Sequence, residues 1–198
     1  AKSNSIELVS CGDDGVVRLW TFRPPEGLKL SASHATHAGN VTSVCHLRGL
    51  VVSGGVDKNV ALWVPPPAAA AATHAAAGGG RAGVAMAGAG SAVLDVAVCE
   101  EASGGPRAFR VAAGAMDGTV RVWAVSLPPP PAPGQGSPGA APAAVPLVTV
   151  LRAHADWVHG VAFVPGSGGQ RLATSSRDRY VRTWAIKSGG ADAAAAGA

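Results

Sequence analysis

Residues 174–184 read TSSRDRYVRTW, and three other segments of the chain match this stretch without gaps. They are SCGDDGVVRLW at 10–20, SGGVDKNVALW at 53–63 and AGAMDGTVRVW at 113–123. In each segment an aspartate stands six residues before a tryptophan, and a cluster of small or polar residues precedes a β-rich run. The pattern predicts a tight turn followed by a β-strand that is covered on both faces.

A second matched strand lies upstream of three of these segments. It reads VTSVCH at 41–46, VLDVAV at 93–98 and VHGVAF at 158–163. In two cases a histidine, His37 or His154, stands four residues before the first valine. Units that recur at such intervals predict a repeat architecture in which each unit completes its core against its neighbours.

The four units resemble the WD-repeat family, whose members build β-propellers from four-stranded antiparallel blades. The resemblance implies an all-β fold and an incomplete ring, in a partial propeller over residues 1–187. Its blades are expected at 6–32, 37–90, 91–151 and 154–187. The first blade would lack its inner strand and the last its outer strand. One departure is that none of the four tryptophans at the repeated position, which we call register tryptophans, is followed by the acidic residue that gives the family its name.

The sequence between consecutive register tryptophans is longer in the later repeats, and low-complexity tracts account for the difference. The tracts 64–90 and 127–144 are rich in proline, alanine and glycine, and Arg81 is their one charged residue. Such sequence cannot build a core, so we expect two flexible loops near the outer strands, where insertions are tolerated. The alanine-rich tail at 188–198 is expected to be disordered in the same way.

The resemblance implies a structural role for the recurring polar residues. In the family, a hydrogen-bonded chain runs from the tryptophan indole N–H through a serine or threonine hydroxyl and a histidine to the aspartate, because buried polar groups need partners. The second unit supplies His37, Ser53, Asp57 and Trp63, and the fourth supplies His154, Thr174, Asp178 and Trp184. The matching positions of the other units are Ser10, Asp14, Trp20, Asp117 and Trp123.

The third unit departs from this pattern. Alanines, Ala89 and Ala113, stand where the histidine and the hydroxyl residue are expected, so we expect its blade to be the least rigid. Serine, histidine and aspartate also form catalytic triads. A nucleophile would occur once in a cleft, whereas this set recurs with the repeat, so we expect no enzymatic activity.

Other chemistry is not indicated. Three widely spaced cysteines, Cys11, Cys45 and Cys99, are expected to be buried free thiols of a reducing compartment. The glycine-rich segments lack the strand–loop–helix context of a phosphate loop. Neighbouring Cys45 and His46 would point to opposite faces of a strand, so they could not share a zinc ion. We expect no cofactor and no metal.

Charge and length narrow the class of partner. The net charge is +4, but no run of consecutive lysine or arginine occurs, so nucleic acid is not expected as a partner. No strongly apolar segment is long enough to span a membrane. No secretory signal opens the chain, and its first residue is Ala1 rather than Met. We therefore expect a piece of a longer intracellular protein, cytoplasmic or nuclear.

The resemblance also implies where other proteins would bind. In the family, three positions per blade project to the rim of one channel mouth: the residues before and after the first inner-strand valine, and the residue before the turn aspartate. Here they are Asn40, Ala92 and Trp157; Thr42, Leu94 and His159; and Asp13, Val56, Met116 and Arg177.

Trp157 is the one tryptophan outside the repeat register. Aromatic and arginine side chains dominate binding energies at interfaces, so we expect Trp157, His159 and Arg177 to form a partner-binding cluster. Val56, Leu94 and Met116 would add an apolar strip. The alternative is that Trp157 packs against an adjacent blade.

These features favour a scaffold that holds other proteins, as a subunit of a larger complex. One alternative is a substrate receptor of a cullin-type ubiquitin ligase, although Trp20-Thr21-Phe22-Arg23 lacks the acid of the family's Trp-Asp-x-Arg docking ending. Another alternative is a regulatory propeller domain of a multidomain protein. A hydrolase-type propeller would need carboxylates or histidines around the channel, outside the structural sets.

Overall fold

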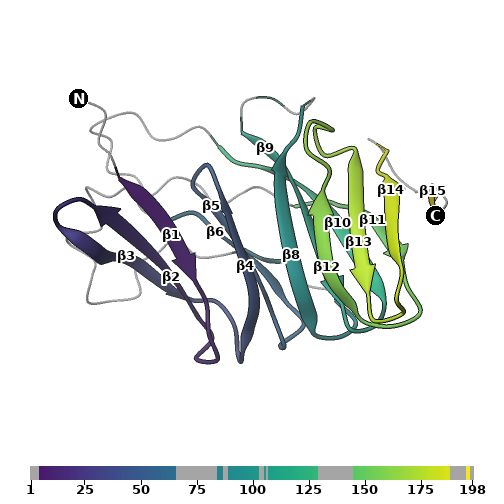
Figure 1. Ribbon diagram of the computed structural model, residues 1–198, viewed down its shortest axis with the longest axis horizontal. Helices are drawn as coiled ribbons and strands as arrows, with labels where there is room; N and C mark the ends of the chain where they lie inside the picture. The colour runs from purple at the N-terminus through teal and green to yellow at the C-terminus, as the bar shows by residue number, and fades with distance from the viewer. Residues whose placement is uncertain are drawn as a thin grey trace.

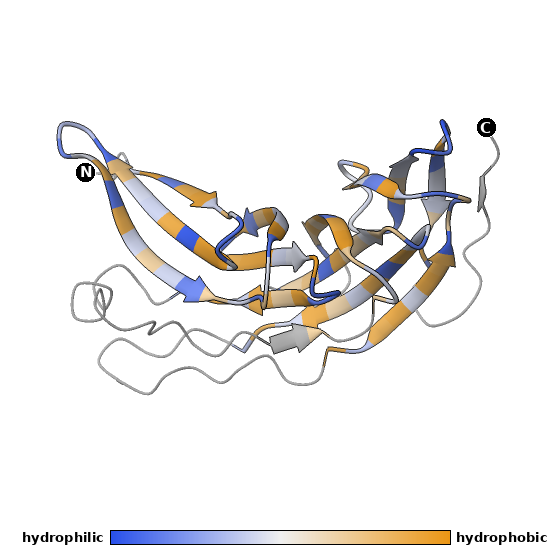
Figure 2. Cartoon of the chain, turned by 90° about the horizontal axis from the view of Figure 1, so that it is seen from below, coloured by the Kyte–Doolittle hydropathy of each residue, from blue (hydrophilic) through white to orange (hydrophobic). Residues whose placement is uncertain are grey.

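Four antiparallel β-sheets lie side by side in a curved row (Figures 1 and 2). The computed structural model describes residues 5–65, 84–86, 89–102, 105, 107–128, 145–187 and 195–196. Within these ranges every regular element is a β-strand, and the row of sheets does not close into a ring. The expected fold class, all-β blades in an incomplete ring, is confirmed.

Consecutive strands pair within each sheet, as hairpin connections dictate. The first sheet contains β1 (Ile6–Ser10), β2 (Val16–Arg23) and β3 (Gly27–Ala35). The second contains β4 (Val41–Leu47), β5 (Leu50–Gly55), β6 (Val60–Trp63) and β7 (Val84–Met86). The third contains β8 (Val93–Glu100), β9 (Ala108–Ala115), β10 (Thr119–Ser126) and β11 (Leu147–Arg152). The fourth contains β12 (Val158–Phe163), β13 (Arg171–Ser176), β14 (Val181–Ala185) and β15 (Ala195–Ala196).

Two short strands lie where the sequence predicts loop or disorder. Strand β7 belongs to the tract 64–90 and pairs with β6, with Val60 opposite Met86. Strand β15 belongs to the tail and pairs with β14. In both cases the outer edge of the sheet carries free N–H and C=O groups, and the added strand satisfies part of that edge. Most of the remaining residues of 64–90, 127–144 and 188–198 lie outside the described part of the chain.

The core lies between the sheets rather than inside any one of them. Each register tryptophan after the first packs on the preceding sheet, so Trp63, Trp123 and Trp184 are 1%, 3% and 7% exposed. In the first three sheets, the opposite face of this strand receives the next sheet. The expected coverage of both strand faces is therefore found in the middle of the row.

The inner strands β4, β8 and β12 share an irregularity near their first residue. Their pairing shifts register at Thr42, Leu94 and His159, so each of these residues is bulged out of the ladder. A β-bulge bends its strand and turns the side chain of the extra residue in a new direction. All three bulged residues are among the predicted rim positions.

Candidate protein-binding site

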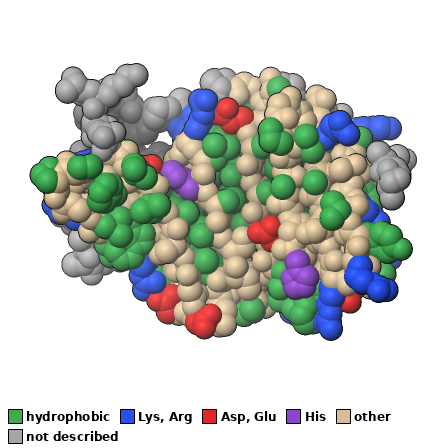
Figure 3. All heavy atoms as spheres, viewed as in Figure 1, with side chains coloured by type: hydrophobic (Ala, Val, Ile, Leu, Met, Phe, Trp, Pro, Cys, Tyr) green, Lys and Arg blue, Asp and Glu red, His purple; other side chains and the backbone are tan. Residues whose placement is uncertain are grey.

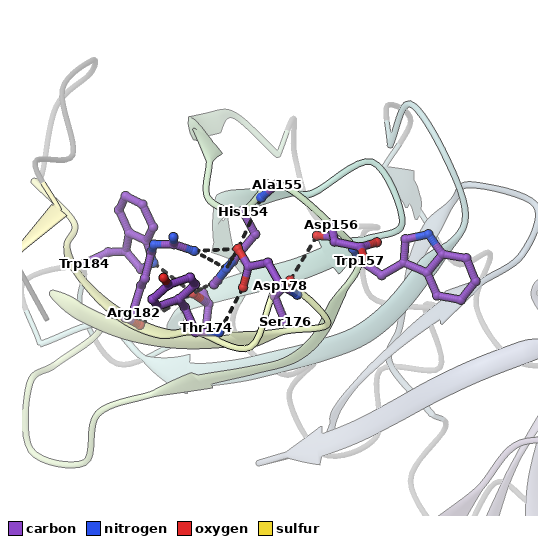
Figure 4. A network of polar contacts seen from close by, with 10 residues as sticks. His154, Ala155, Asp156, Trp157, Thr174, Ser176, Asp178, Arg182 and Trp184 are labelled. Atoms are coloured by element: carbon purple, nitrogen blue, oxygen red, sulfur yellow. Dashed lines mark hydrogen bonds and ion pairs between the residues drawn. The ribbon is translucent and has the colours of Figure 1, made fainter.

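A hydrogen-bonded chain crosses the fourth sheet (Figure 4). The Trp184 indole N–H donates to Thr174 Oγ1 at 3.0 Å, and Thr174 Oγ1 lies 2.8 Å from His154 Nε2. His154 Nδ1 lies 2.9 Å from Asp178 Oδ2. Since the carboxylate only accepts, Nδ1 carries the proton and the Thr174 hydroxyl donates to Nε2. The chain ties the loop before β12 to the turn between β13 and β14.

Asp178 ends this chain in a dense set of donors. Burial raises the pKa of its carboxyl, but hydrogen bonds from Arg182 at 2.8 Å and from the Tyr180 N–H at 3.0 Å lower it, as do those from His154 and the Ala155 N–H. The balance holds the pKa well below the ordinary aspartate value. Asp178 is therefore a carboxylate that serves as an acceptor for four groups at once.

The second sheet carries a shorter hydrogen-bonded chain. His37 bonds Asp57 Oδ1 through Nδ1 and Ser53 Oγ through Nε2, each at 2.9 Å. Burial raises the pKa of Asp57, but the hydrogen bonds from His37 and the neighbouring N–H groups lower it by more. The pKa is therefore below the ordinary aspartate value. The Trp63 indole N–H, however, has no hydrogen-bond partner in the described part of the chain.

His34 occupies the space beside Trp63. The two rings lie 5.6 Å apart between centroids, and His34 Nδ1 is buried without a hydrogen-bond partner among the described residues. Burial lowers the pKa of His34 and favours the neutral ring. Strand β3 brings this ring onto the second sheet.

The first and third units keep only part of the hydrogen-bonded chain. The Trp20 indole N–H donates to Ser10 Oγ at 2.9 Å, while Asp14 accepts the Val16 N–H at 3.1 Å and the Arg18 guanidinium of β2 at 2.5 Å. Asp117 accepts the Thr119 N–H at 3.0 Å, and Ala113 packs in a core cluster where a hydroxyl would otherwise be. The turn aspartates thus stabilise their own turns.

The buried groups of these chains cannot meet a substrate where they lie. Ser53 is 2% and Thr174 1% exposed. The side chains of His37 and His154 are 0% exposed. Among the described residues no group of three or more potential metal ligands is found.

The three cysteines are unpaired and partly buried. Burial raises the pKa of Cys45 to about 12, helped by the negative charge of Asp95, and burial raises the pKa of Cys99 to about 11. Burial also raises the pKa of Cys11. The reactive thiolate is therefore scarce near neutral pH.

The predicted binding positions come together along one edge of the row, which we call the rim. The N–H groups of Val56 and Arg177 donate to the carbonyls of Asn40 and Trp157, each at 3.0 Å. Met116 bonds Ala92 in the same way at 3.0 Å. Within each of these three sheets, the residue before the turn aspartate therefore lies beside the residue before the inner strand.

Neighbouring sheets also join at the rim. The His37 N–H donates to the carbonyl of Gly15 at 3.3 Å, and the His154 N–H donates to that of Gly118 at 3.0 Å. Both glycines have left-handed backbones, and a Cβ on either would lie within 2.5 Å of the neighbouring carbonyl oxygen. Glycine is needed there because the next sheet approaches the turn so closely.

Trp157, His159 and Arg177 form one cluster at the fourth sheet. The Arg177 guanidinium carbon lies 5.1 Å from the centre of the Trp157 ring, within cation–π range. The Trp157 and His159 rings are 6.0 Å apart. His159 is exposed, Trp157 is half-buried, and the Arg177 side chain is 61% exposed. The Trp157 indole points away from the His154 chain (Figure 4).

The other predicted rim residues differ in how open they are. Val56 is 43% exposed, and Asp13 and Asn40 are also exposed. Leu94 and Met116 are half-buried. The Thr42 hydroxyl donates to the carbonyls of Val93 at 2.6 Å and Gly54 at 2.9 Å. Thr42 therefore joins two sheets.

Sequence reasoning missed two acidic residues with clear roles. Asp156 lies 3.9 Å from Arg177 and accepts the Trp157 N–H at 2.8 Å, so it belongs to the cluster. Asp95 accepts the Ser43 hydroxyl at 2.8 Å and the Val161 N–H at 2.9 Å, and so links three sheets. The available signal for Asp95 was that it is the one carboxylate in the matched inner strands.

The radial row of antiparallel sheets, in which every sheet after the first packs its tryptophan face on the preceding sheet, defines the β-propeller class. The sequence model of the family "WD domain, G-beta repeat" matches residues 2–21, 87–124 and 145–185. The chain belongs to the WD40 family. No curated protein matches the chain.

Solved structures agree with this fold. The WD40 β-propeller domain of Doa1 is similar with a TM-score of 0.59 and 22% identity, over 94% of this chain and 49% of that one. The computationally designed Ika8 protein has a TM-score of 0.59 and 21% identity, over 91% of this chain and 43% of that one. The chain thus spans about half the length of these propellers.

Membership narrows the class of function. WD40 propellers mediate protein interactions, typically as non-catalytic scaffolds. In the part of the chain that the structure describes, no helix could cross a membrane.

Proposed function

We propose that this chain is a non-catalytic scaffold that binds a protein partner at the rim, with Trp157, His159 and Arg177 as the anchor. The observation that carries the proposal is the arrangement of these three side chains. A large aromatic ring, a guanidinium and an imidazole lie together at the rim of the fourth sheet. The repeat's own hydrogen-bonded chain uses none of them.

The chemistry of the cluster selects the partner. Arg177 leans on the Trp157 ring, which restricts its guanidinium and lowers the entropic cost of binding a carboxylate. His159 adds a second donor next to the ring. The ring itself offers apolar area. The best match is a segment that places an acidic side chain at Arg177 and an apolar side chain against Trp157, and the net charge of +4 favours an acidic partner.

Neighbouring rim residues extend this surface. A Cβ at Gly118, which follows Met116 and Asp117 in the third-sheet turn, would lie 3.3 Å from the Asp156 carbonyl oxygen. The turn that carries Met116 therefore lies next to the loop that carries Trp157. We assign Met116 to the apolar side of the same surface.

The test is site-specific photo-crosslinking in cell extract. A photoreactive amino acid replaces His159 in one chain and Leu147, 49% exposed on the outer strand β11, in the matched control. We expect specific covalent adducts from position 159 and none from position 147. Adducts from position 147 alone, or equal adducts from both, would contradict binding at the rim.

A further inference from the structure

The inner strands β4, β8 and β12 are equivalent to one another over the three residues that follow their first valine. The first of these residues is the bulged one, Thr42, Leu94 or His159. The second is Ser43, Asp95 or Gly160, and the third is Val44, Val96 or Val161. The three strands are neighbours along the row (Figure 1), and each is the edge strand of its own sheet. Such a strand has backbone N–H groups that its sheet leaves without a partner.

Hydrogen bonds between sheets satisfy two of these N–H groups. The Val96 N–H donates to Ser43 Oγ at 3.3 Å, and the Val161 N–H donates to Asp95 Oδ2 at 2.9 Å. In both cases a side chain of one sheet accepts from the valine at the equivalent place in the next sheet. The same contact therefore forms between the second and third sheets and again between the third and fourth.

Asp95 holds the sheets on both of its sides. While Oδ2 accepts the Val161 N–H of the fourth sheet, Oδ1 accepts the Ser43 hydroxyl of the second sheet at 2.8 Å. A carboxylate can do this because it has two acceptor oxygens, whereas a hydroxyl has one. The face over the inner strands carries few charged side chains (Figure 3), and the half-buried Asp95 is held there by hydrogen bonds.

The hydrogen bond to Val161 acts on the strand that carries the partner-binding cluster of Trp157, His159 and Arg177. The first valine of β12, Val158, packs closely on the third sheet, because a Cβ on Gly114 of β9 would lie 2.7 Å from its Cγ1. The contact at Val158 and the hydrogen bond at Val161 lie on either side of His159. A β-bulge disrupts the ladder locally, so contacts from the third sheet fix the position of this bulge.

We propose that Asp95 is a positioning residue for the partner-binding cluster. By holding β12 just after its bulge, Asp95 sets where His159 and the preceding Trp157 project from the rim. Asp95 acts through β12 and needs no contact with the partner. The inference rests on the proposed function, in which this cluster is the anchor.

Nuclear magnetic resonance of the Trp157 indole N–H tests this role without a partner. The signal reports the cluster, because the Arg177 guanidinium and the His159 ring lie beside the indole. Trp157→Phe identifies it among the five tryptophans. Asp95→Ala removes both hydrogen bonds, so we expect the signal to move. Asp95→Asn keeps an oxygen for the Val161 N–H and gains an N–H for Ser43 Oγ, so it should leave the signal near its wild-type position without the charge.

Ser53→Ala is the matched control. It removes a buried hydrogen bond from the second sheet and leaves both Asp95 hydrogen bonds intact, so the Trp157 signal should stay in place. An unmoved signal in Asp95→Ala, an equal shift in Ser53→Ala, or an equal shift in Asp95→Asn would overturn the proposal. Near-ultraviolet circular dichroism checks folding. Asp95→Leu, which has a similar branched shape and no acceptor, replaces Asp95→Ala if that variant unfolds.

The dissociation constant of the crosslinked partner measures the consequence for binding. We expect Asp95→Ala to raise it about tenfold and Asp95→Asn to keep it within about twofold of wild type, because the change acts through packed neighbours. An unchanged dissociation constant in Asp95→Ala would also overturn the proposal. If position 159 gives no specific adducts, the proposed function is contradicted instead, and the Trp157 signal still decides whether Asp95 positions the cluster.

Discussion

Tryptophans at the same repeat position differ in the hydrogen-bond partner of the indole N–H. The indole N–H of Trp184 donates to Thr174, and that of Trp20 donates to Ser10. The N–H of Trp63 is buried and has no partner within the described ranges, although Ser53 stands at the position of Thr174. The difference is energetic, because a buried N–H that loses water without gaining an acceptor costs about 1–3 kcal/mol.

A matched pair of substitutions measures this difference. Trp184→Phe removes a buried hydrogen bond, whereas Trp63→Phe removes an N–H that has no acceptor among the described residues. Both remove similar ring area. We expect Trp184→Phe to lower the free energy of unfolding by about 1 kcal/mol more than Trp63→Phe does. Urea denaturation of the two variants gives the comparison, and equal losses would contradict the assigned hydrogen bonding.

The carboxyl of Asp178 gives a pH-dependent prediction. Its pKa in the folded chain is lowered below the ordinary value of 3.8, despite the opposing effect of burial, by Arg182, His154 and backbone N–H groups. The stabilisation is therefore complete above the ordinary pKa and is lost as the pH falls toward the folded pKa. Carbon NMR of this carboxyl should show it still ionised below pH 3.8, and titrating near its ordinary value in concentrated urea. A folded-state midpoint at the ordinary value would be the contrary result.

At the scale of the elements, the third sheet changes the expectation drawn from its sequence. Its missing histidine and hydroxyl suggested the least rigid blade. In the structure every residue of β9 is buried, and Ala89 and Ala113 pack with a core cluster. When both members of a hydrogen-bonded pair are replaced by apolar groups that fit, the change can be nearly neutral.

Hydrogen exchange decides between the two expectations. Strand β5 is also buried along its whole length, and it keeps the hydrogen bond between Ser53 and His37. We now expect β9 amides to be as well protected as those of β5. Exchange of β9 about tenfold faster, equal to about 1.4 kcal/mol of local stability, would restore the sequence-based expectation.

The strands show what sequence could predict and what it could not. The turn aspartate and register tryptophan located β2, β6, β10 and β14, because they recur in strict spacing. Strands β7 and β15 escaped because low-complexity sequence carries no periodic signal. The partners of Asp95 and His34 could not be predicted, since those contacts join residues that only the packing of separate sheets brings together.

The rim was predictable for a different reason. Its residues stand at fixed offsets from the turn aspartate and the inner strand, so the alignment with the WD-repeat pattern located them. The stacking of Arg177 on Trp157 and the nearby Asp156 depend on side-chain conformation, which the sequence does not specify.

In the whole molecule, the residues that stabilise the sheets differ from the residues that we propose bind a partner. Buried chains such as the one from Trp184 to Asp178 hold each sheet together. The sheets in turn hold the rim positions on rigid elements along one edge. A rigid array of this kind lowers the entropy lost on binding, which is what a scaffold needs. We propose that Trp157 serves partner binding rather than stability.

The affinity of the crosslinked partner for Trp157→Ala tests this role, with Leu147→Ala as the control. Removing a central aromatic anchor costs about 2 kcal/mol or more, so we expect the dissociation constant to rise about 30-fold or more. The thermal unfolding of both variants should stay close to wild type. An unchanged dissociation constant in a folded Trp157→Ala chain would contradict a role of Trp157 in partner binding.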